Sequence, residues 1–267
     1  MKKKPREPGR TGLSRRRLLE AAATGVLAQT ALARDARADW VGRVLDLGPG
    51  VDEAVQRAVV PTNARAQEYT QADISAHFRS NGTHDPDDAE YQRLASQGFA
   101  DWRLAVDGLV DRPLVLSLAD IRAMPSVTQI TRHDCVEGWN CIGQWTGVPF
   151  SHLLALAGVQ KAARYVVFFC YDKVNSAGDV SGAAENYYES IDLTEVAHPQ
   201  TLLAYAMNGE TLPIPYGAPL RLRLGRQLGY KMPKYLKRVA LVRDFHGIEG
   251  GRGGFYEDNG YAWYAGI

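Results

Sequence analysis

One cysteine, set among polar and aromatic residues, is the position in this sequence best suited to redox chemistry. Cys135 lies in the segment HDCVEGW at 133–139, and WTGVP follows at 145–149. A thiolate is a soft donor that suits a high-valent redox metal, and a loop cysteine beside polar groups is well placed to bind one. Taken alone, the residue type still favours a structural cysteine. A disulfide between Cys135 and Cys141 is a third interpretation.

The elements that would position Cys135 are short strands and a few short helices. A capping-box-like start at Ser117 predicts a helix that ends before Pro125, and an apolar run predicts another from Pro149 to Leu156. Strands are predicted from alternating or continuous apolar residues over 102–108, 127–132, 165–170, 220–224 and 235–242. Residues 39–96 are predicted to be irregular, and Cys135 falls in a loop between the strand at 127–132 and the helix from Pro149. This pattern predicts an α+β domain built on mixed β-sheet.

The N-terminus has the order of a secretory signal. Basic residues with SRRRLL at 14–19 precede a mildly apolar stretch over 21–33 and then Ala36-Arg37-Ala38. Paired arginines after a serine, followed by leucines, are typical of the twin-arginine export route. We therefore expect a cleaved signal peptide over 1–38, cut after Ala38 or Ala33, and a periplasmic domain over 39–267. Because this route exports folded proteins, it favours a protein that carries a complex cofactor.

Composition and charge restrict the class of partner. The 267 residues are 45% apolar and 23% charged, which suits one globular domain with an ordinary core. Ten of the 31 basic residues but only three of the 30 acidic residues lie in 1–38, so the remainder is net acidic. An acidic mature protein argues against nucleic acid as a partner.

The motif around Cys135 resembles the molybdenum-ligand segment of the sulfite-oxidase family. CVEGW is close to the CVEAW form of periplasmic methionine-sulfoxide reductase catalytic subunits, and the similarity extends over most of residues 70–245. Asp107–Val110 resembles the family's early strand and turn, and the segment from Ala197 to Gly209 resembles its late one. The resemblance implies a sulfite-oxidase-type fold holding one molybdenum-molybdopterin, with Cys135 as the protein thiolate on the metal.

The resemblance also implies which loops hold the pterin. The segment 78–82 looks like the family's first pterin loop, 217–221 looks like the second, and 229–234 looks like the third. Charge-assisted contacts to the pterin phosphate are the role implied for Arg221, Lys231 and Lys234. The alternative is that these basic residues only solvate a strand face, which is the favoured interpretation for Arg223 and Lys237. The residues carried over as cofactor-binding are Phe78, Arg79, Asn81, Gly82, Cys170, Tyr216, Arg221, Lys231, Met232 and Lys234.

Two of these positions depart from the reductase pattern, and one further residue carries a catalytic implication. Tyr216 replaces an asparagine, and Cys170, a small buried residue in its predicted strand, replaces a threonine. Tyr187 resembles the active-site tyrosine of the family's Tyr-x-x-Ser-Ile segment. A phenol there can donate a hydrogen bond or help move a proton, although a half-buried strand aromatic is an equal interpretation.

These residues favour an enzyme that moves an oxygen atom, with Cys135, Tyr187 and Glu137 as its catalytic residues. Sulfite oxidases carry basic residues after the ligand cysteine, whereas this chain carries Glu137. Reduction of an S- or N-oxide such as methionine sulfoxide, free or protein-bound, is therefore favoured over sulfite oxidation. A non-enzymatic exported β-rich binding protein with a Cys135–Cys141 disulfide is the alternative of another class. A haem-attachment CxxCH motif does not occur, so electrons are expected from a membrane cytochrome or quinone-linked partner. The additional dimerisation domain of eukaryotic sulfite oxidases is not expected here, so the catalytic chain is expected to be monomeric.

Overall fold

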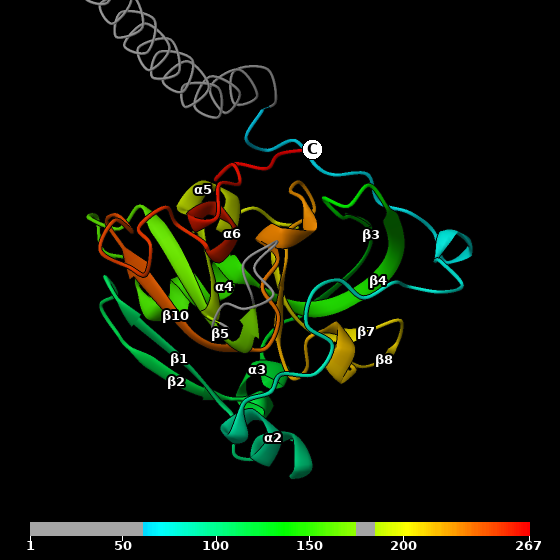
Figure 1. Ribbon diagram of the computed structural model, residues 1–267, viewed down its shortest axis with the longest axis horizontal. Coiled ribbons are helices and arrows are strands. Elements are labelled where there is room, and N and C mark those ends of the chain that lie inside the picture. Colours follow the sequence, from blue (N-terminus) through cyan, green and yellow to red (C-terminus); the bar gives the residue numbers. More distant parts are fainter. Residues whose placement is uncertain (1–60, 175–184) are drawn as a thin grey trace, which may run out of the picture. The chain divides into compact units, whose positions relative to one another are not determined.

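The computed structural model describes residues 61–174 and 185–267. Segments with alternating or continuous apolar residues form two β-sheets in it (Figure 1). All of these residues belong to one compact unit, Glu53–Ile267. The expected signal peptide over 1–38 and both of its cleavage positions lie outside the described residues.

The first sheet has the strand order β2-β1-β10-β5-β6. Its strands are β1 (Arg103–Gly108), β2 (Leu114–Ser117), β5 (Tyr165–Val174), β6 (Glu185–Asp192) and β10 (Leu236–Val242). β1 pairs in parallel with β10, whereas the other neighbours are antiparallel. The mixed sheet confirms the predicted α+β class, and β1, β5 and β10 agree with the predicted strands at 102–108, 165–170 and 235–242.

The second sheet has the order β3-β4-β7-β8, and β9 also pairs with β7. Its strands are β3 (Val127–Asp134), β4 (Asn140–Pro149), β7 (Leu202–Met207), β8 (Glu210–Thr211) and β9 (Arg221–Arg223). The prediction of a loop between residue 132 and the next helix was wrong, because β4 fills most of it. Two of the inward positions of β4 are Gly143 and Gly147, so the apolar alternation that marks a strand is interrupted. Cys135 consequently lies in the turn of a β3–β4 hairpin.

Short helices complete the domain. They are α2 (Ala89–Ser96), α3 (Leu118–Ala123), α4 (Phe150–Ala157), α5 (Leu193–Val196) and α6 (Phe255–Asp258), with 3-10 turns η1 (Gln71–Asp73), η2 (Ile214–Tyr216) and η3 (Gly229–Lys231). α3 has the predicted capping box of Ser117 and Asp120. The prediction that 39–96 is irregular was wrong at α2, where the Asp88 carboxylate accepts hydrogen bonds from two first-turn amides. Among the described residues, no helix is long and apolar enough to cross a membrane.

Two apolar clusters hold these elements together. The larger joins the first sheet to α2, α3 and α4 through buried residues such as Trp102, Phe150 and Phe168. The smaller surrounds Trp145 of β4 and includes Phe78, Cys141 and Met207. Phe78 packs edge-on against Trp145, with 5.5 Å between ring centroids, which fixes the 78–82 loop against the second sheet.

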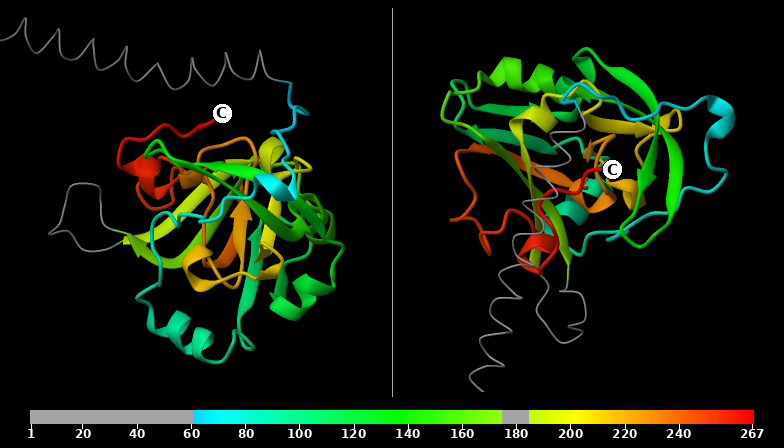
Figure 2. Two further views of the ribbon diagram at one scale, coloured as in Figure 1. Left: turned by 90° about the vertical axis from the view of Figure 1, so that its right-hand side faces the viewer. Right: turned by 90° about the horizontal axis from the view of Figure 1, so that it is seen from above.

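The C-terminal segment, residues 250–267, lies across β6 and η3 (Figure 2). Gly254 bridges to Glu189 of β6, and Gly266 bridges to Gln227. The Leu228 amide donates to the Ala265 carbonyl at 2.9 Å. These backbone bonds hold α6 beside the loop that ends in η3.

Candidate functional site

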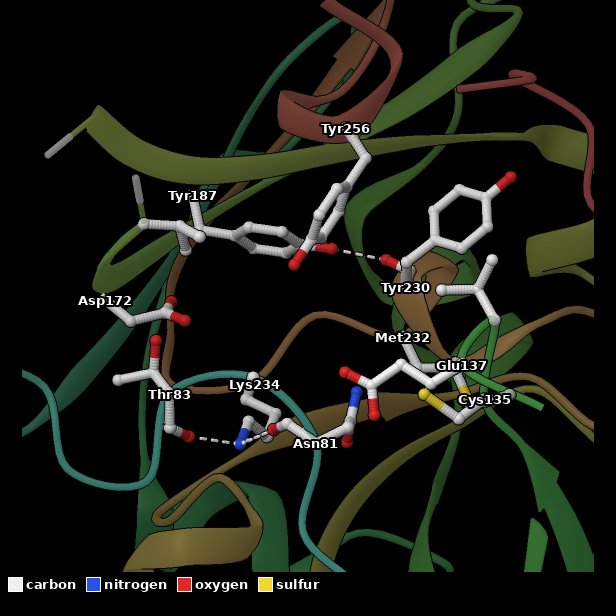
Figure 3. Close-up of a pocket in the computed structure, with 14 residues that line it drawn as sticks. Asn81, Thr83, Cys135, Glu137, Asp172, Tyr187, Tyr230, Met232, Lys234 and Tyr256 are labelled. Atoms are coloured by element: carbon white, nitrogen blue, oxygen red, sulfur yellow. Dashed lines mark hydrogen bonds between the residues drawn. The ribbon is translucent and has the colours of Figure 1, made fainter. Parts of the chain in front are cut away.

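A cavity with about 560 Å³ of empty space lies where the Cys135 turn, the 81–83 loop, η3 and α6 meet (Figure 3). Its walls come from six separate stretches of chain. The lining residues are Asn81, Gly82, Thr83, Cys135, Val136, Glu137, Asp172, Val174, Tyr187, Gly229, Tyr230, Met232, Lys234 and Tyr256.

Cys135 reaches the cavity because the β3–β4 turn is tight. Its amide donates to the Trp139 carbonyl at 2.9 Å, and Gly138, with φ of 86°, supplies the left-handed residue that closes the turn. Burial is the main reason that the pKa of the Cys135 thiol is raised, so at neutral pH the protein alone keeps it protonated. A bound metal cation would remove that proton.

The described cysteines are all free, which contradicts the Cys135–Cys141 disulfide. The Cys141 sulfur instead faces the 77–79 segment, where it lies 3.4 Å from the Arg79 amide and 3.8 Å from the His77 carbonyl. Cys141 therefore helps to fix the first loop.

Three tyrosines form one wall of the cavity. The Tyr256 ring lies 5.9 Å from both the Tyr187 and the Tyr230 ring, measured between centroids. The Tyr187 hydroxyl donates to the Tyr230 carbonyl. Tyr187 was a predicted site residue, and it is buried rather than half-buried. Tyr230 lies in the predicted third loop at 229–234 but was not named as a site residue, and Tyr256 was missed.

Three buried cations, Arg221, Arg223 and Lys234, lie close together beside this cavity. The Arg221 and Arg223 guanidinium carbons lie 5.0 and 4.3 Å from the centre of the Trp145 ring. The Lys234 ammonium lines the cavity and donates to the carbonyls of Asn81 and Pro215. Among the described residues, none of the three forms a salt bridge.

Burial lowers the pKa of each of these basic groups, and Arg221 lowers those of Lys234 and Arg223 further. Burial, and then Arg221, lowers the pKa of Lys234 to about 7, and burial lowers the pKa of Arg221 to about 10. Burial together with Arg223 holds the pKa of His133 well below its usual range. An anion placed beside these groups would relieve their mutual repulsion.

Lys231 has a different environment from its neighbour Lys234. Its ammonium lies 2.5 Å from the carboxylates of both Glu189 and Glu257, and all three side chains are buried. Glu257 belongs to α6 and Glu189 to β6, so Lys231 joins the C-terminal segment to the first sheet. Its charge is already paired within the protein.

Glu137 and Arg79 lie at the mouth of the cavity. The Glu137 carboxylate accepts a hydrogen bond from the Trp139 indole at 2.8 Å and lies 3.4 Å from the Arg79 guanidinium. Their side chains are 64% and 60% exposed, so this pair is screened by water. Beyond them a second cavity, with about 950 Å³ of empty space, shares Asn81, Gly82 and Glu137 with the first.

The predicted site residues divide into three groups. Seven line the first cavity: Asn81, Gly82, Cys135, Glu137, Tyr187, Met232 and Lys234. Three line only the second cavity: Phe78, Arg79 and Tyr216. The remaining three, Cys170, Arg221 and Lys231, line neither and are buried behind the walls.

Comparison with known proteins connects this arrangement to a family. Residues 92–246 match the family described as "Oxidoreductase molybdopterin binding domain". The "Putative protein-methionine-sulfoxide reductase subunit YedZ1" of Azospira oryzae is 37% identical over 215 residues, 80% of this chain and 73% of that protein. The "Protein-methionine-sulfoxide reductase catalytic subunit MsrP" of Ralstonia nicotianae is 30% identical over 234 residues, 85% of this chain and 68% of that protein.

A solved structure, that of the sulfane dehydrogenase SoxCD from Paracoccus pantotrophus, aligns with a TM-score of 0.46 and 25% identity. The alignment covers 54% of this chain and 39% of the SoxCD chain. The match to the family over more than half of the chain, together with the two relatives, confirms the resemblance: the chain belongs to the molybdopterin-binding oxidoreductases of the sulfite-oxidase family.

Proposed function

We propose that this chain is the exported catalytic subunit of a molybdopterin-dependent reductase that acts on methionine sulfoxide, free or within a protein. The overall reaction consumes one sulfoxide, two electrons and two protons, and it yields one sulfide and one water. When bound, the cofactor supplies the two-electron chemistry. The protein binds the cofactor, positions the sulfoxide and excludes water.

The residues around the first cavity fit such a cofactor. The molybdopterin phosphate is an anion, and the three cations beside the cavity are buried and form no salt bridge among the described residues, although Asp172 on the cavity wall partly offsets the charge of Lys234. Buried charge of this kind is costly unless a ligand pairs with it. The Nε2 atom of His133 and the Nε1 atom of Trp145 are buried nearby, and neither has a hydrogen-bond partner within 61–174 or 185–267. Lys234, which lines the cavity, would hold the phosphate together with the charges of Arg221 and Arg223 behind the wall, and Cys135 would bind the metal.

The observation that carries the choice of substrate is the character of the remaining walls. Tyr187, Tyr256 and Met232 line the same cavity as the Cys135 thiol, and Figure 3 shows the Tyr256 ring directed into it. Such surfaces suit a neutral methyl sulfoxide, because sulfur and methyl groups pack favourably on aromatic rings. The acidic Glu137 at the mouth disfavours a dianion such as sulfite.

Metal and pterin analysis of the natively exported protein, followed by two activity assays, tests this function. We expect about one molybdenum per chain, reduction of methionine sulfoxide with a reduced viologen dye, and poor oxidation of sulfite. Cys135→Ser should abolish sulfoxide reduction. Cys141→Ser is its matched control and should stay active, because a hydroxyl can keep the contacts of Cys141 to the first loop. Efficient sulfite oxidation without sulfoxide reduction would reverse the proposed direction.

Glu137→Gln measures how far charge selects the substrate. Two unit charges at contact in water interact by about 1 kcal/mol, so the exposed Glu137 repels a dianion by at most about 2 kcal/mol. The substitution should strengthen sulfite binding by no more than about tenfold, with little change for a neutral sulfoxide. An equal effect on both substrates would show that the charge of Glu137 does not discriminate between them.

The remaining parts of the proposal concern the chain as a whole. Residues 1–38 would direct twin-arginine export, and 39–267 would form the periplasmic domain. The name of the Ralstonia relative, a catalytic subunit, supports a separate partner that delivers electrons. A membrane cytochrome or quinone-linked subunit is the partner we propose for this monomeric chain.

A further inference from the structure

Tyr256 belongs to a segment outside the matched family domain, yet its side chain completes the wall of the first cavity. The segment is fixed on both sides of this residue. The neighbouring Phe255 is 2% exposed in the larger apolar cluster, and the next residue, Glu257, is paired with Lys231. Tyr256 is therefore held in one position by its neighbours in sequence.

The hydroxyl groups of the three wall tyrosines have different partners. A phenol has one hydrogen to donate. Tyr187 donates its hydrogen to the Tyr230 carbonyl, and Tyr230 donates its own to the Ala262 carbonyl at 2.8 Å. The hydroxyl of Tyr256 has no hydrogen-bond partner among the described residues, and Figure 3 shows it directed into the cavity. Tyr256 can thus donate to a ligand without breaking a bond that the protein already makes.

The electrostatic surroundings keep this hydroxyl protonated. Burial, and then neighbouring groups that include Tyr261, Asp172, Cys135 and Glu137, raise the pKa of Tyr256. A sulfoxide oxygen is a strong acceptor, and its methyl group is apolar. The Tyr256 side chain offers both a donor and a ring face to the cavity that Cys135 also lines.

We propose that Tyr256 is a further catalytic residue, which donates a hydrogen bond to the sulfoxide oxygen while its ring contacts the methyl group. The proposal rests on the sulfoxide reductase function. It assigns the donor role to Tyr256 in place of Tyr187, whose hydrogen is held by the Tyr230 carbonyl.

Calorimetric binding of methionine sulfoxide and of methionine to the cofactor-loaded protein tests this assignment. Methionine has the same thioether skeleton but lacks the oxygen. Losing one net hydrogen bond should weaken sulfoxide binding in Tyr256→Phe by about two- to twelvefold, with methionine binding unchanged. The value of kcat/KM for the sulfoxide should fall by at least the same factor.

Tyr261→Phe is the matched control. The Tyr261 ring packs 5.1 Å from that of Tyr256 but does not line the cavity, so its substitution should leave both ligands unaffected. Sulfoxide-selective loss in Tyr187→Phe, but not in Tyr256→Phe, would overturn the assignment. Equal loss of both ligands in Tyr256→Phe would also overturn it, because the ring alone would then be responsible. If the unsubstituted protein neither binds nor reduces methionine sulfoxide, the reductase function itself fails.

Discussion

Replacing Arg221 with methionine separates the role of this residue in cofactor binding from its role in the fold. The Arg221 side chain is 1% exposed and donates to the carbonyls of Tyr216 at 2.9 Å and Met232 at 3.4 Å. Methionine keeps much of the apolar volume, removes the charge and leaves these two carbonyls without their donor. In the cofactor-free protein, the relief of an unpaired buried charge offsets the lost hydrogen bonds. We expect its free energy of unfolding to change by less than about 2 kcal/mol.

The cofactor-loaded protein should respond differently. A hydrogen bond to a charged group contributes about 1.5–3 kcal/mol, which corresponds to a loss of cofactor affinity of roughly ten- to a hundredfold. The assay is molybdenum and pterin per folded chain, with urea unfolding of the cofactor-free protein measured in parallel. Arg238→Met is the control, because Arg238 is 46% exposed and pairs with Asp107 away from the cavity. Unchanged occupancy in Arg221→Met would refute a phosphate-holding role.

Three further outcomes are expected. Cys135→Ser should abolish sulfoxide reduction while the chain stays folded, because a hard hydroxyl replaces a soft thiolate; full activity would exclude Cys135 as the metal ligand. Lys231→Met should lower the free energy of unfolding by about 3–5 kcal/mol, since it leaves Glu189 and Glu257 buried without a cation; a urea midpoint close to that of the unsubstituted protein would contradict this. Burial lowers the pKa of Lys234 to about 7 in the folded chain, whereas the pKa of a lysine in the unfolded chain is 10.5. The unfolded state therefore binds more protons above pH 7, and the stability of the cofactor-free protein should rise from pH 7 to 10, a slope that Lys234→Met should remove.

Local patterns predicted the fold better than the partners of individual charges. Apolar runs and a capping box were sufficient for β1, β5, β10 and α3, since these features depend on near neighbours in sequence. β4 was missed because glycines occupy inward positions that sequence patterns expect to be apolar.

The candidate site, like the fold, was predicted where local motifs determine it and missed where distant segments do. The CVEGW motif predicted the position of Cys135, and the 78–82 and 229–234 loops do converge on its cavity. Sequence similarity could not distinguish Lys231 from Lys234, three residues apart, because the difference lies in Glu257 on a distant segment. Tyr256 was missed for the same reason: it is brought to the cavity by the backbone bridges of the C-terminal segment, which no local pattern encodes.

The anchoring of α6 through Lys231 has a consequence for the order of assembly on the ribosome. Residues 255–258 are translated after every other stretch that lines the cavity. A nascent chain therefore has its Cys135 turn, its 81–83 loop and η3 available while the side later covered by Tyr256 is still open. Formation of the Glu257–Lys231 contact closes that side. The same contact therefore both completes the cavity and stabilises its wall, so the site is finished only when the stretch made last is in place.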